Sequence, residues 1–293
     1  KNPSIIVHAK KEKFKNLLIY DAINKILNKN KILAPSIYSE NYSKNYIEIQ
    51  DFGDETIFNK LKKNKINRYM YFKKIIKLLN KIQSIKNRKI KNFKNKNYKI
   101  PKYDNKILIN EANLFCEWYA KKNLSKSNKN KFSKEFKRII IKLTSKLKLR
   151  NNVFVHRDFH VSNLMIVNNQ IGVIDSQDAL IGNRAYDLAS LIDDVRLKTS
   201  KPFKRKIYNF YLKRQKKLEV KKFKNDFEIL SILRNLKIIG IFTRLAIRDG
   251  KKHYLKLIPY TWQLISMRIN ENELFRELED LLNKYFKKKL NAN

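Results

Sequence analysis

The sequence is poor in cysteine and in long apolar runs, and both shortages exclude classes of protein. Its one cysteine, Cys116, cannot form an intramolecular disulfide and belongs to no recognisable metal cluster. The longest apolar stretches are short pieces such as residues 238–242, whereas a membrane-spanning helix needs about 18 apolar residues. We find no signal peptide after the first residue, Lys1, and therefore expect a cytoplasmic protein without a membrane partner.

Glycine is also scarce. The five glycines stand at positions 53, 172, 182, 240 and 250 and do not cluster. The sequence therefore lacks a glycine-rich loop of the kind that wraps the phosphates of a nucleotide. Lys10 is a poor candidate for contacting such phosphates, because it follows the first expected strand instead of lying in it.

Acidic residues are few, with 26 Asp and Glu against 67 Lys and Arg, and the formal net charge is +41. Such a charge often indicates a nucleic acid or an anionic membrane as partner. Here the lysines are spread along the chain and alternate with Asn and Ile, as in residues 86–100. A/T-rich codons encode all three residue types. We interpret the charge as a solvated surface and expect no specific nucleic-acid partner.

The length and the 43% hydrophobic content fit a two-lobed globular protein. Residues 4–8 are rich in β-branched side chains and predict a strand, and apolar residues at helical spacing predict a helix over Phe14–Leu27. Two further strands are expected at 37–38 and 46–49. The order is strand, helix, strand, strand.

Beyond Gly53 the pattern becomes mainly helical. We therefore expect a partial amino-terminal lobe and hinge at 1–53 and a catalytic and substrate-binding lobe at 54–293. Residues 86–106 lack periodicity and are expected to form a Lys/Asn-rich loop. Apolar stripes predict helices around residues 69–82, 114–119, 132–143, 188–192 and 230–242.

Three short apolar strands interrupt these helices. They are expected at 153–155, 164–167 and 171–174, and residues 168–170 would join the last two as a hairpin. Polar residues stand at the ends of the strands. This arrangement is typical of a site whose side chains are carried by turns between strands.

One such turn carries a motif. His156, Arg157, Asp158 and Asn163 form H-R-D-x-x-x-x-N, and Asp175 ends the following hairpin. In phosphoryl transfer one Asp accepts the proton of the acceptor hydroxyl, while an Asn and a second Asp supply oxygen ligands to Mg²⁺. Hard cations prefer such ligands. The spacing favours a phosphotransferase.

These residues also carry a family resemblance. HRDFHVSNLMIV, GVIDSQDA and AYDLASL resemble the aminoglycoside phosphotransferase and choline kinase superfamily, whose fold is similar to that of protein kinases. With IQDFGDETI, EWY and RNLKIIGIFTRLAIRDGKKHYL, the chain is most similar to the bacterial anomeric kinases of N-acetylmuramate and N-acetylglucosamine in peptidoglycan recycling. The matching segments span residues 47–255.

The resemblance implies an α+β, protein-kinase-like fold with a small, apparently truncated β-containing lobe and a mostly helical carboxy-terminal lobe. It implies ATP and Mg²⁺ as cofactors, Asp158 as the catalytic base, and Asn163 and Asp175 as metal ligands. The ATP-binding residues would be a hinge and an apolar floor beneath adenine, formed by Gln50, Asp51, Phe52, Met165 and Ile174. Either the chain starts inside the amino-terminal lobe or phosphate binding depends on metal alone.

The same resemblance suggests further roles. Gln177 and Asp178 are expected to face the acceptor sugar or to cap a turn. Arg234, like Arg244 and Arg248, could meet the lactyl carboxylate of muramate. Two other positions are Asp187, expected to tie its helix to the catalytic loop, and Ser176, which stands where this branch usually has an aromatic residue.

Two alternatives remain open. Another small alcohol, choline or an aminoglycoside, could be the acceptor, and a cationic aminoglycoside would need acids such as Asp178, Asp193 and Asp194. The second alternative is a binding module, a basic kinase-like protein without catalytic activity. Such a protein would have no chemical need for the intact Asp158, Asn163 and Asp175. The expected partner is a small amino sugar, and the oligomeric state is not predicted.

Overall fold

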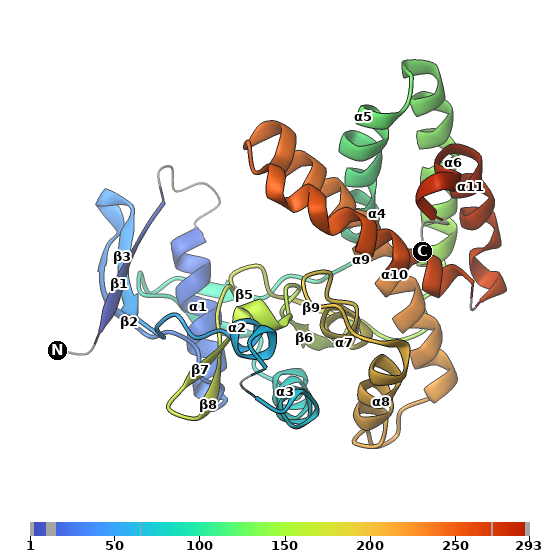
Figure 1. The fold of residues 1–293 in the computed structure, drawn as a ribbon. Coiled ribbons are helices and arrows are strands. Elements are labelled where there is room, and N and C mark those ends of the chain that lie inside the picture. Colours follow the sequence, from blue (N-terminus) through green and yellow to red (C-terminus); the bar gives the residue numbers. More distant parts are fainter. Residues whose placement is uncertain (1–2, 10–15, 65, 271, 291–293) are drawn as a thin grey trace. The chain divides into compact units, whose positions relative to one another are not determined.

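A computed structural model describes residues 3–9, 16–64, 66–270 and 272–290 (Figure 1). The chain divides into two compact units, each built from separate segments. The first unit comprises Lys1–Lys102, Asn151–Leu191 and Lys201–Gln215, and the second comprises Tyr103–Arg150, Ile192–Ser200 and Lys216–Asn293. Gly53 lies within the first unit, so the units do not divide at the boundary placed there from the sequence. The lobes 1–53 and 54–293 stay a prediction.

An antiparallel sheet and a helix open the first unit. The elements are β1 (Ser4–His8), α1 (Asn16–Lys29), β2 (Ile37–Asn41) and β3 (Tyr46–Gln50), with the strands in the order β1-β3-β2. Leu17 of α1 packs with Ile47 and Ile49 of β3. The three predicted strands and the helix are confirmed. The expected helix start at Phe14, like Lys10, lies outside the described residues.

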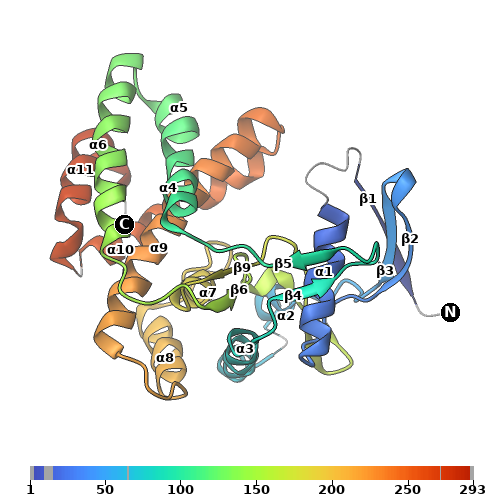
Figure 2. The ribbon, with the colours of Figure 1, turned by 180° about the vertical axis from the view of Figure 1, so that it is seen from behind.

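The expected loop at 86–106 is wrong in part, because it contains a small hairpin beside α1 (Figure 2). Two helices precede this hairpin, and the elements are α2 (Ile57–Lys62), α3 (Arg68–Gln83), β4 (Lys89–Lys91) and β5 (Asn97–Lys99). The turn is held by Asn92, whose Oδ1 accepts from the backbone N–H groups of Lys94 and Lys96 at 3.0 and 3.1 Å. Strands of three residues are too short to show an alternating pattern.

Two further antiparallel pairs follow in the first unit. Strand β6 (Val153–Val155) pairs with β9 (Leu180–Gly182), and β7 (Leu164–Val167) pairs with β8 (Gln170–Val173). The predicted hairpin is therefore confirmed, with its strand ending one residue earlier than expected. Its turn places Asn168 and Asn169 at φ of 46° and 63°, which suits a two-residue hairpin turn. Strand β9 was not predicted.

The first unit is completed by helices α7 (Ala185–Ile192), which passes into the second unit at its last residue, and α8 (Lys201–Leu212). Phe203 of α8 meets Phe72 of α3 with ring centroids 5.1 Å apart. The Tyr211 hydroxyl donates to the Gln83 side chain at 2.7 Å. These contacts attach α8 to α3.

The second unit is a helical assembly around an aromatic core (Figure 1). Phe115 lies at its centre, with Phe132, Phe136, Trp262 and Phe286 at ring-centroid distances of 5.6 to 5.8 Å. The helices are α4 (Asn105–Leu114), the π-helical segment η3 (Phe115–Ala120), α5 (Lys121–Asn123), α6 (Lys126–Ser145), α9 (Val220–Arg248), α10 (Ile258–Ile269) and α11 (Arg276–Leu290).

Helix α9 crosses α4 and η3 at close range. A Cβ atom at Gly240 would come within 2.4 Å of the Leu114 backbone, so the contact requires glycine. Over the described ranges, none of the helices is both long and apolar enough to cross a membrane.

Candidate active site

The loop that carries the H-R-D motif lies between β6 and η4 (Val161–Asn163) and is attached to the start of α7. Asp187, which is fully buried, accepts from the backbone N–H of His156 at 2.7 Å and from that of Arg157 at 3.0 Å. A carboxylate that accepts two backbone bonds is a strong anchor. The expected role of Asp187, tying its helix to this loop, is confirmed.

His156 connects the loop to the hairpin that follows. Its ring Nε2 lies 3.1 Å from the backbone oxygen of Ile174, and the side chain is fully buried. Burial lowers the pKa of His156 below its ordinary value, although the negative charge of Asp158 and Asp175 opposes the shift. A neutral ring can donate from Nε2 to this carbonyl, while the buried Nδ1 has no hydrogen-bond partner within the described residues.

Asn163 brings together the residues of the predicted site. Its side-chain Nδ2 donates to the backbone oxygen of Asp158 at 3.1 Å, while its own backbone oxygen accepts from Ile174 N–H at 3.1 Å. The residue after Ile174 is Asp175. Residues 158, 163 and 175 therefore lie in one hydrogen-bonded neighbourhood, although 12 positions separate the last two in sequence.

Two residues here adopt the left-handed backbone region without being glycine. Arg157 has φ of 74° and Asp175 has φ of 61°. Such conformations cost of order 1–3 kcal/mol and persist where neighbouring contacts enforce them. In Asp175 the conformation is combined with a side-chain contact, because Gln177 Nε2 donates to its Oδ1 at 2.7 Å.

Gln177 and Asp178, expected to face an acceptor or to cap a turn, have partners within the site. Gln177 holds Asp175, as described. Asp178 meets Arg157, whose Nη1 donates to its backbone oxygen at 3.1 Å and lies 3.6 Å from its carboxylate. The Asp178 side chain is 62% exposed, so this ion pair contributes little to stability.

Ser176 reaches a partner that the sequence did not reveal. Its Oγ donates to Asn24 Oδ1 on α1 at 2.5 Å, across 152 positions of sequence. Tyr20, one turn earlier on α1, has its pKa raised to about 12, mainly by burial and also by the charge of Asp175, against a hydrogen bond to Asn24. The one sequence signal was Ser176 itself, a small polar residue where an aromatic one was expected.

The expected hinge and adenine floor lie together in part. A Cβ atom at Gly172 would stand 2.6 Å from the Phe52 ring, and Gly172 is opposite Met165 in the hairpin register. Phe52 therefore packs against the hairpin at Gly172, the residue that pairs with Met165. The backbone N–H groups of Gln50 and Asp51 donate elsewhere, to Ser36 O at 2.8 Å and Pro3 O at 3.1 Å.

Asp51 has a local role in addition. Its Oδ1 accepts from Gly53 N–H at 2.7 Å, and Gly53 has φ of 72°, which favours glycine. The D-F-G sequence at these positions is therefore a turn after β3.

Arg234 lies on α9 in the second unit and is 3% exposed. Its Nη1 has no hydrogen-bond partner within the described ranges, and the same holds for both polar atoms of the fully buried Asn235. Buried polar groups in this state cost about 1–3 kcal/mol each. A ligand or water that completed them would be favoured, and Asn235 is a residue that the sequence reading missed.

Asp193, considered as a partner for a cationic acceptor, is neutralised inside the second unit. Arg268 Nη2 lies 2.9 Å from its Oδ2, and Ser231 Oγ donates to the same oxygen at 2.6 Å. Asp194 accepts from Arg196 N–H at 3.0 Å. The arginine at 248 forms an exposed pair with Asp249.

No group of three or more His, Cys, Asp and Glu side chains able to hold a metal occurs in the parts of the chain that the structure describes. The predicted pair, Asn163 and Asp175, fits a different kind of site. Mg²⁺ takes one or two protein oxygens and completes its shell with water and substrate phosphates. Because Asn163 Nδ2 is engaged with Asp158, the amide orientation is set and its Oδ1 is directed away from that bond.

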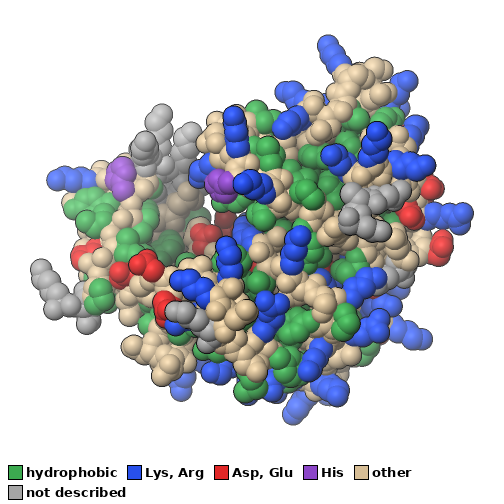
Figure 3. All heavy atoms as spheres, in the orientation of Figure 1, with side chains coloured by type: hydrophobic (Ala, Val, Ile, Leu, Met, Phe, Trp, Pro, Cys, Tyr) green, Lys and Arg blue, Asp and Glu red, His purple; other side chains and the backbone are tan. Residues whose placement is uncertain are grey.

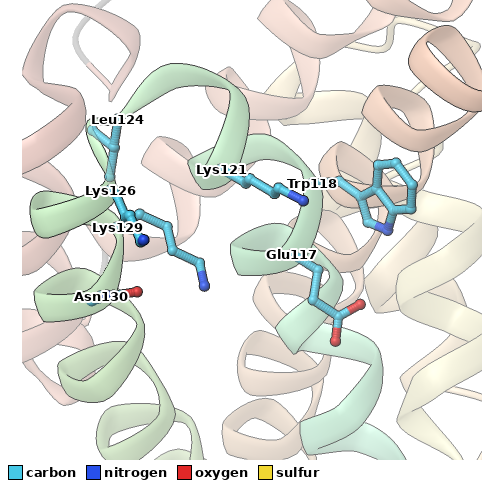
Figure 4. Close-up of a pocket in the computed structure, with 7 residues that line it drawn as sticks. All are labelled: Glu117, Trp118, Lys121, Leu124, Lys126, Lys129 and Asn130. Carbon is cyan, nitrogen blue, oxygen red and sulfur yellow. The ribbon is translucent and has the colours of Figure 1, made fainter.

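A hollow of about 680 Å³ lies in the second unit between η3 and α6 (Figure 4). Lys121, Lys126 and Lys129 line it together with Glu117, whose side chain accepts from Asn113. Glu117 is the one carboxylate among these lining residues, whereas the proposed chemistry needs one carboxylate as the base and further oxygen groups as metal ligands. The hollow is therefore no substitute for the site in the first unit.

Comparison with known proteins agrees with this geometry. Residues 7–220 match the phosphotransferase enzyme family. The chain belongs to this family. The resemblance inferred from the sequence is thereby confirmed, and so is the expectation of a phosphotransferase-family enzyme.

Curated relatives share a more specific name. The chain is 35% identical over 166 residues to the N-acetylmuramate/N-acetylglucosamine kinase of Neisseria meningitidis, covering 55% of this chain and 50% of that protein. It is 31% identical over 189 residues to the enzyme of that name from Pseudomonas aeruginosa, covering 62% and 56%. The match thus spans about half the length of these relatives.

Solved structures of low sequence identity share the fold. A choline/ethanolamine kinase family protein from Mesorhizobium loti has a TM-score of 0.63 at 11% identity, covering 95% of this chain and 86% of that one. An ethanolamine kinase from Plasmodium vivax has a TM-score of 0.60 at 17% identity, covering 98% and 78%. The predicted kinase-like α+β fold is confirmed.

Proposed function

We propose that the protein transfers the γ-phosphoryl group of MgATP to the anomeric hydroxyl of an amino sugar, N-acetylmuramate or N-acetylglucosamine. The observation that carries the proposal is the bonding of Asn163, which ties the Asp158 turn to the strand end before Asp175. The names of the relatives favour the amino sugar. The reaction would take place in the cytoplasm, as part of peptidoglycan recycling.

Each residue of the loop has a different proposed role. Asp158 accepts the proton of the attacking hydroxyl. Asn163 Oδ1 and the Asp175 carboxylate would hold magnesium, which would supply positive charge to the phosphate oxygens. Gln177 orients Asp175 by its bond to Oδ1, and Arg157 is held beside the loop by Asp178.

The nucleotide would lie over the hairpin. Phe52, Met165 and Ile174 would offer apolar contact to the adenine ring, because Phe52 packs against Gly172, the register partner of Met165 in this hairpin. Gln50 and Asp51 already donate their backbone N–H groups within the unit, so the backbone of Phe52 is the proposed hinge contact to adenine.

We propose Arg234, expected from the sequence to meet a carboxylate, and its neighbour Asn235 as residues that bind a polar ligand in the second unit. Arg234 offers a guanidinium for a carboxylate such as the lactyl group of muramate. The amide of Asn235 has both a donor and an acceptor, which suits hydroxyl or acetamido groups of a sugar. Their buried atoms without protein partners support this assignment.

The ion pair between Asp193 and Arg268 argues against the aminoglycoside alternative, because a carboxylate that is already neutralised attracts a cationic acceptor weakly. The test offers MgATP with N-acetylmuramate, N-acetylglucosamine, kanamycin and choline in parallel. Phosphorus NMR then locates the transferred group. A sugar 1-phosphate is the expected product, whereas product only from kanamycin or choline, or a 6-phosphate, would refute the proposal.

A further inference from the structure

We infer that Asn24 on α1 is a positioning residue for the metal ligand Asp175 and acts on it through Ser176. This inference rests on the proposed function in taking Asp175 as a magnesium ligand. It adds a residue 151 positions away from Asp175, in an element that carries none of the predicted chemistry.

The contact is buried and directional at both ends. Ser176 is fully buried and Asn24 is 2% exposed, and the serine hydroxyl donates to Asn24 Oδ1 at 2.5 Å. The other end of the same amide, Asn24 Nδ2, donates to Pro35 O at 2.9 Å. With both ends engaged, the amide cannot flip without losing two buried hydrogen bonds.

The neighbours of Asp175 in sequence are thereby anchored on both sides. Ile174 is held by its N–H bond to Asn163 O and by the ring of His156 on its carbonyl. Ser176 is held by Asn24. Between these anchors Asp175 keeps φ of 61°, a conformation that needs its surroundings to enforce it.

Fixing this backbone matters because the direction of the carboxylate follows from it. A metal site tolerates errors of about 0.5 Å in the placement of its ligands. If the Ser176 anchor is lost, we expect Asp175 to relax from the left-handed region and its carboxylate to turn. The metal would then bind more weakly while the rest of the fold persists.

Helix α1 contains a matched control one turn further on. Asn28 also holds the segment before β2, donating to Ala34 O and accepting from Ala34 N–H, both at 3.0 Å. Like Asn24 it braces α1 against that segment, but its amide bonds Ala34 at both ends and not Ser176. A general loosening of α1 would therefore follow from either substitution, whereas a loss of metal affinity would follow from Asn24 alone.

The experiment uses the full chain and four variants: Asn24→Ala, Ser176→Ala, the double variant and Asn28→Ala. Free Mn²⁺ is titrated by EPR in the presence of ADP, so that no acceptor is needed, and thermal unfolding is followed in parallel. We expect Asn24→Ala and Ser176→Ala each to weaken Mn²⁺ binding by about fivefold, the effect of one hydrogen bond. The double variant should bind Mn²⁺ no more weakly than the single variant with the larger loss of affinity, because both substitutions remove the same Ser176–Asn24 bond.

The outcomes separate the two proposals. Absence of Mn²⁺ and ADP binding by the unmodified chain would refute the proposed function, and this inference with it. Normal binding by the unmodified chain with unchanged affinity in Ser176→Ala, or an equal loss in Asn28→Ala, would refute the positioning role alone. Should Asn24→Ala not fold, Ser176→Ala still tests the bond, because it removes a single hydroxyl from the other end.

Discussion

The carboxylate of Asp187 accepts a hydrogen bond from the backbone N–H of His156 at 2.7 Å, across 31 positions of sequence. Both residues are fully buried. The bond makes the start of α7 and the catalytic loop a single structural element. It also explains why an acidic residue occupies the first turn of a helix that is largely apolar.

Removal of this carboxylate should destabilise the protein. Asp187→Ala leaves the buried backbone N–H of His156 and the part-buried N–H of Arg157 without their acceptor, and we expect the free energy of unfolding to fall by about 3 kcal/mol. Urea denaturation measures the change. Asp104→Ala, which removes an exposed helix cap, is the control and should cost about 1 kcal/mol. Equal losses in the two variants would contradict the anchoring role.

The proposed base and metal ligand should separate kinetically. Asp158→Asn should lower kcat by at least about 100-fold with little change in nucleotide affinity, because the proton acceptor is lost and the binding groups remain. Asp175→Ala should abolish turnover and weaken binding of MgATP. Single-turnover kinetics measure both effects, with Asp104→Asn, outside the proposed site, as the exposed control. A near-normal rate in either of the first two variants would disprove its role.

The stability of the fold should depend on pH through His156. Its pKa is lowered by burial from 6.5, so the unfolded chain binds more protons than the folded one between the two values. Stability is therefore full above the unfolded pKa and falls as the pH drops below it. Urea unfolding between pH 7.5 and 5.5 tests this, and His156→Asn should flatten the dependence. A slope unchanged by the substitution would exclude His156 as its source.

The position opposite Met165 should accept only glycine while Phe52 is present. In Gly172→Ala the added Cβ would meet the Phe52 ring at 2.6 Å, and we expect a loss of about 1–3 kcal/mol with weaker ATP binding. The double variant Gly172→Ala with Phe52→Leu should recover part of the stability, because leucine removes the ring atoms in the way. Additive losses in denaturation would show that the two sites are uncoupled.

The positive surface should bind nucleic acid without selectivity. Figure 3 shows Lys and Arg side chains dispersed over the face in view, without a single dense patch. Binding that rests on counterion release alone should weaken steeply with salt and vanish near physiological ionic strength. Fluorescence anisotropy with unrelated DNA and RNA sequences checks this. Tight, sequence-selective binding at physiological salt would favour the binding-module alternative.

Much of the site was predictable because it is local in sequence. The spacing from Asp158 to Asn163 and the hairpin that ends before Asp175 are set by short strands and turns whose residue types are diagnostic. Asn168 and Asn169 in the hairpin turn are an example, since both tolerate positive φ. Strand β9 escaped because its three residues carry no pattern that distinguishes them from a loop.

The sequence by itself determined the motif, the hairpin and the helices with clear apolar stripes, because each depends on neighbours within a few positions. Only the tertiary structure decided that Ser176 meets Asn24 and that Asp193 is neutralised by Arg268. Local conformation follows from backbone sterics and the period of apolar residues. The partner of a buried polar group depends on which distant segment packing brings within hydrogen-bond distance, and periodicity carries no information about that.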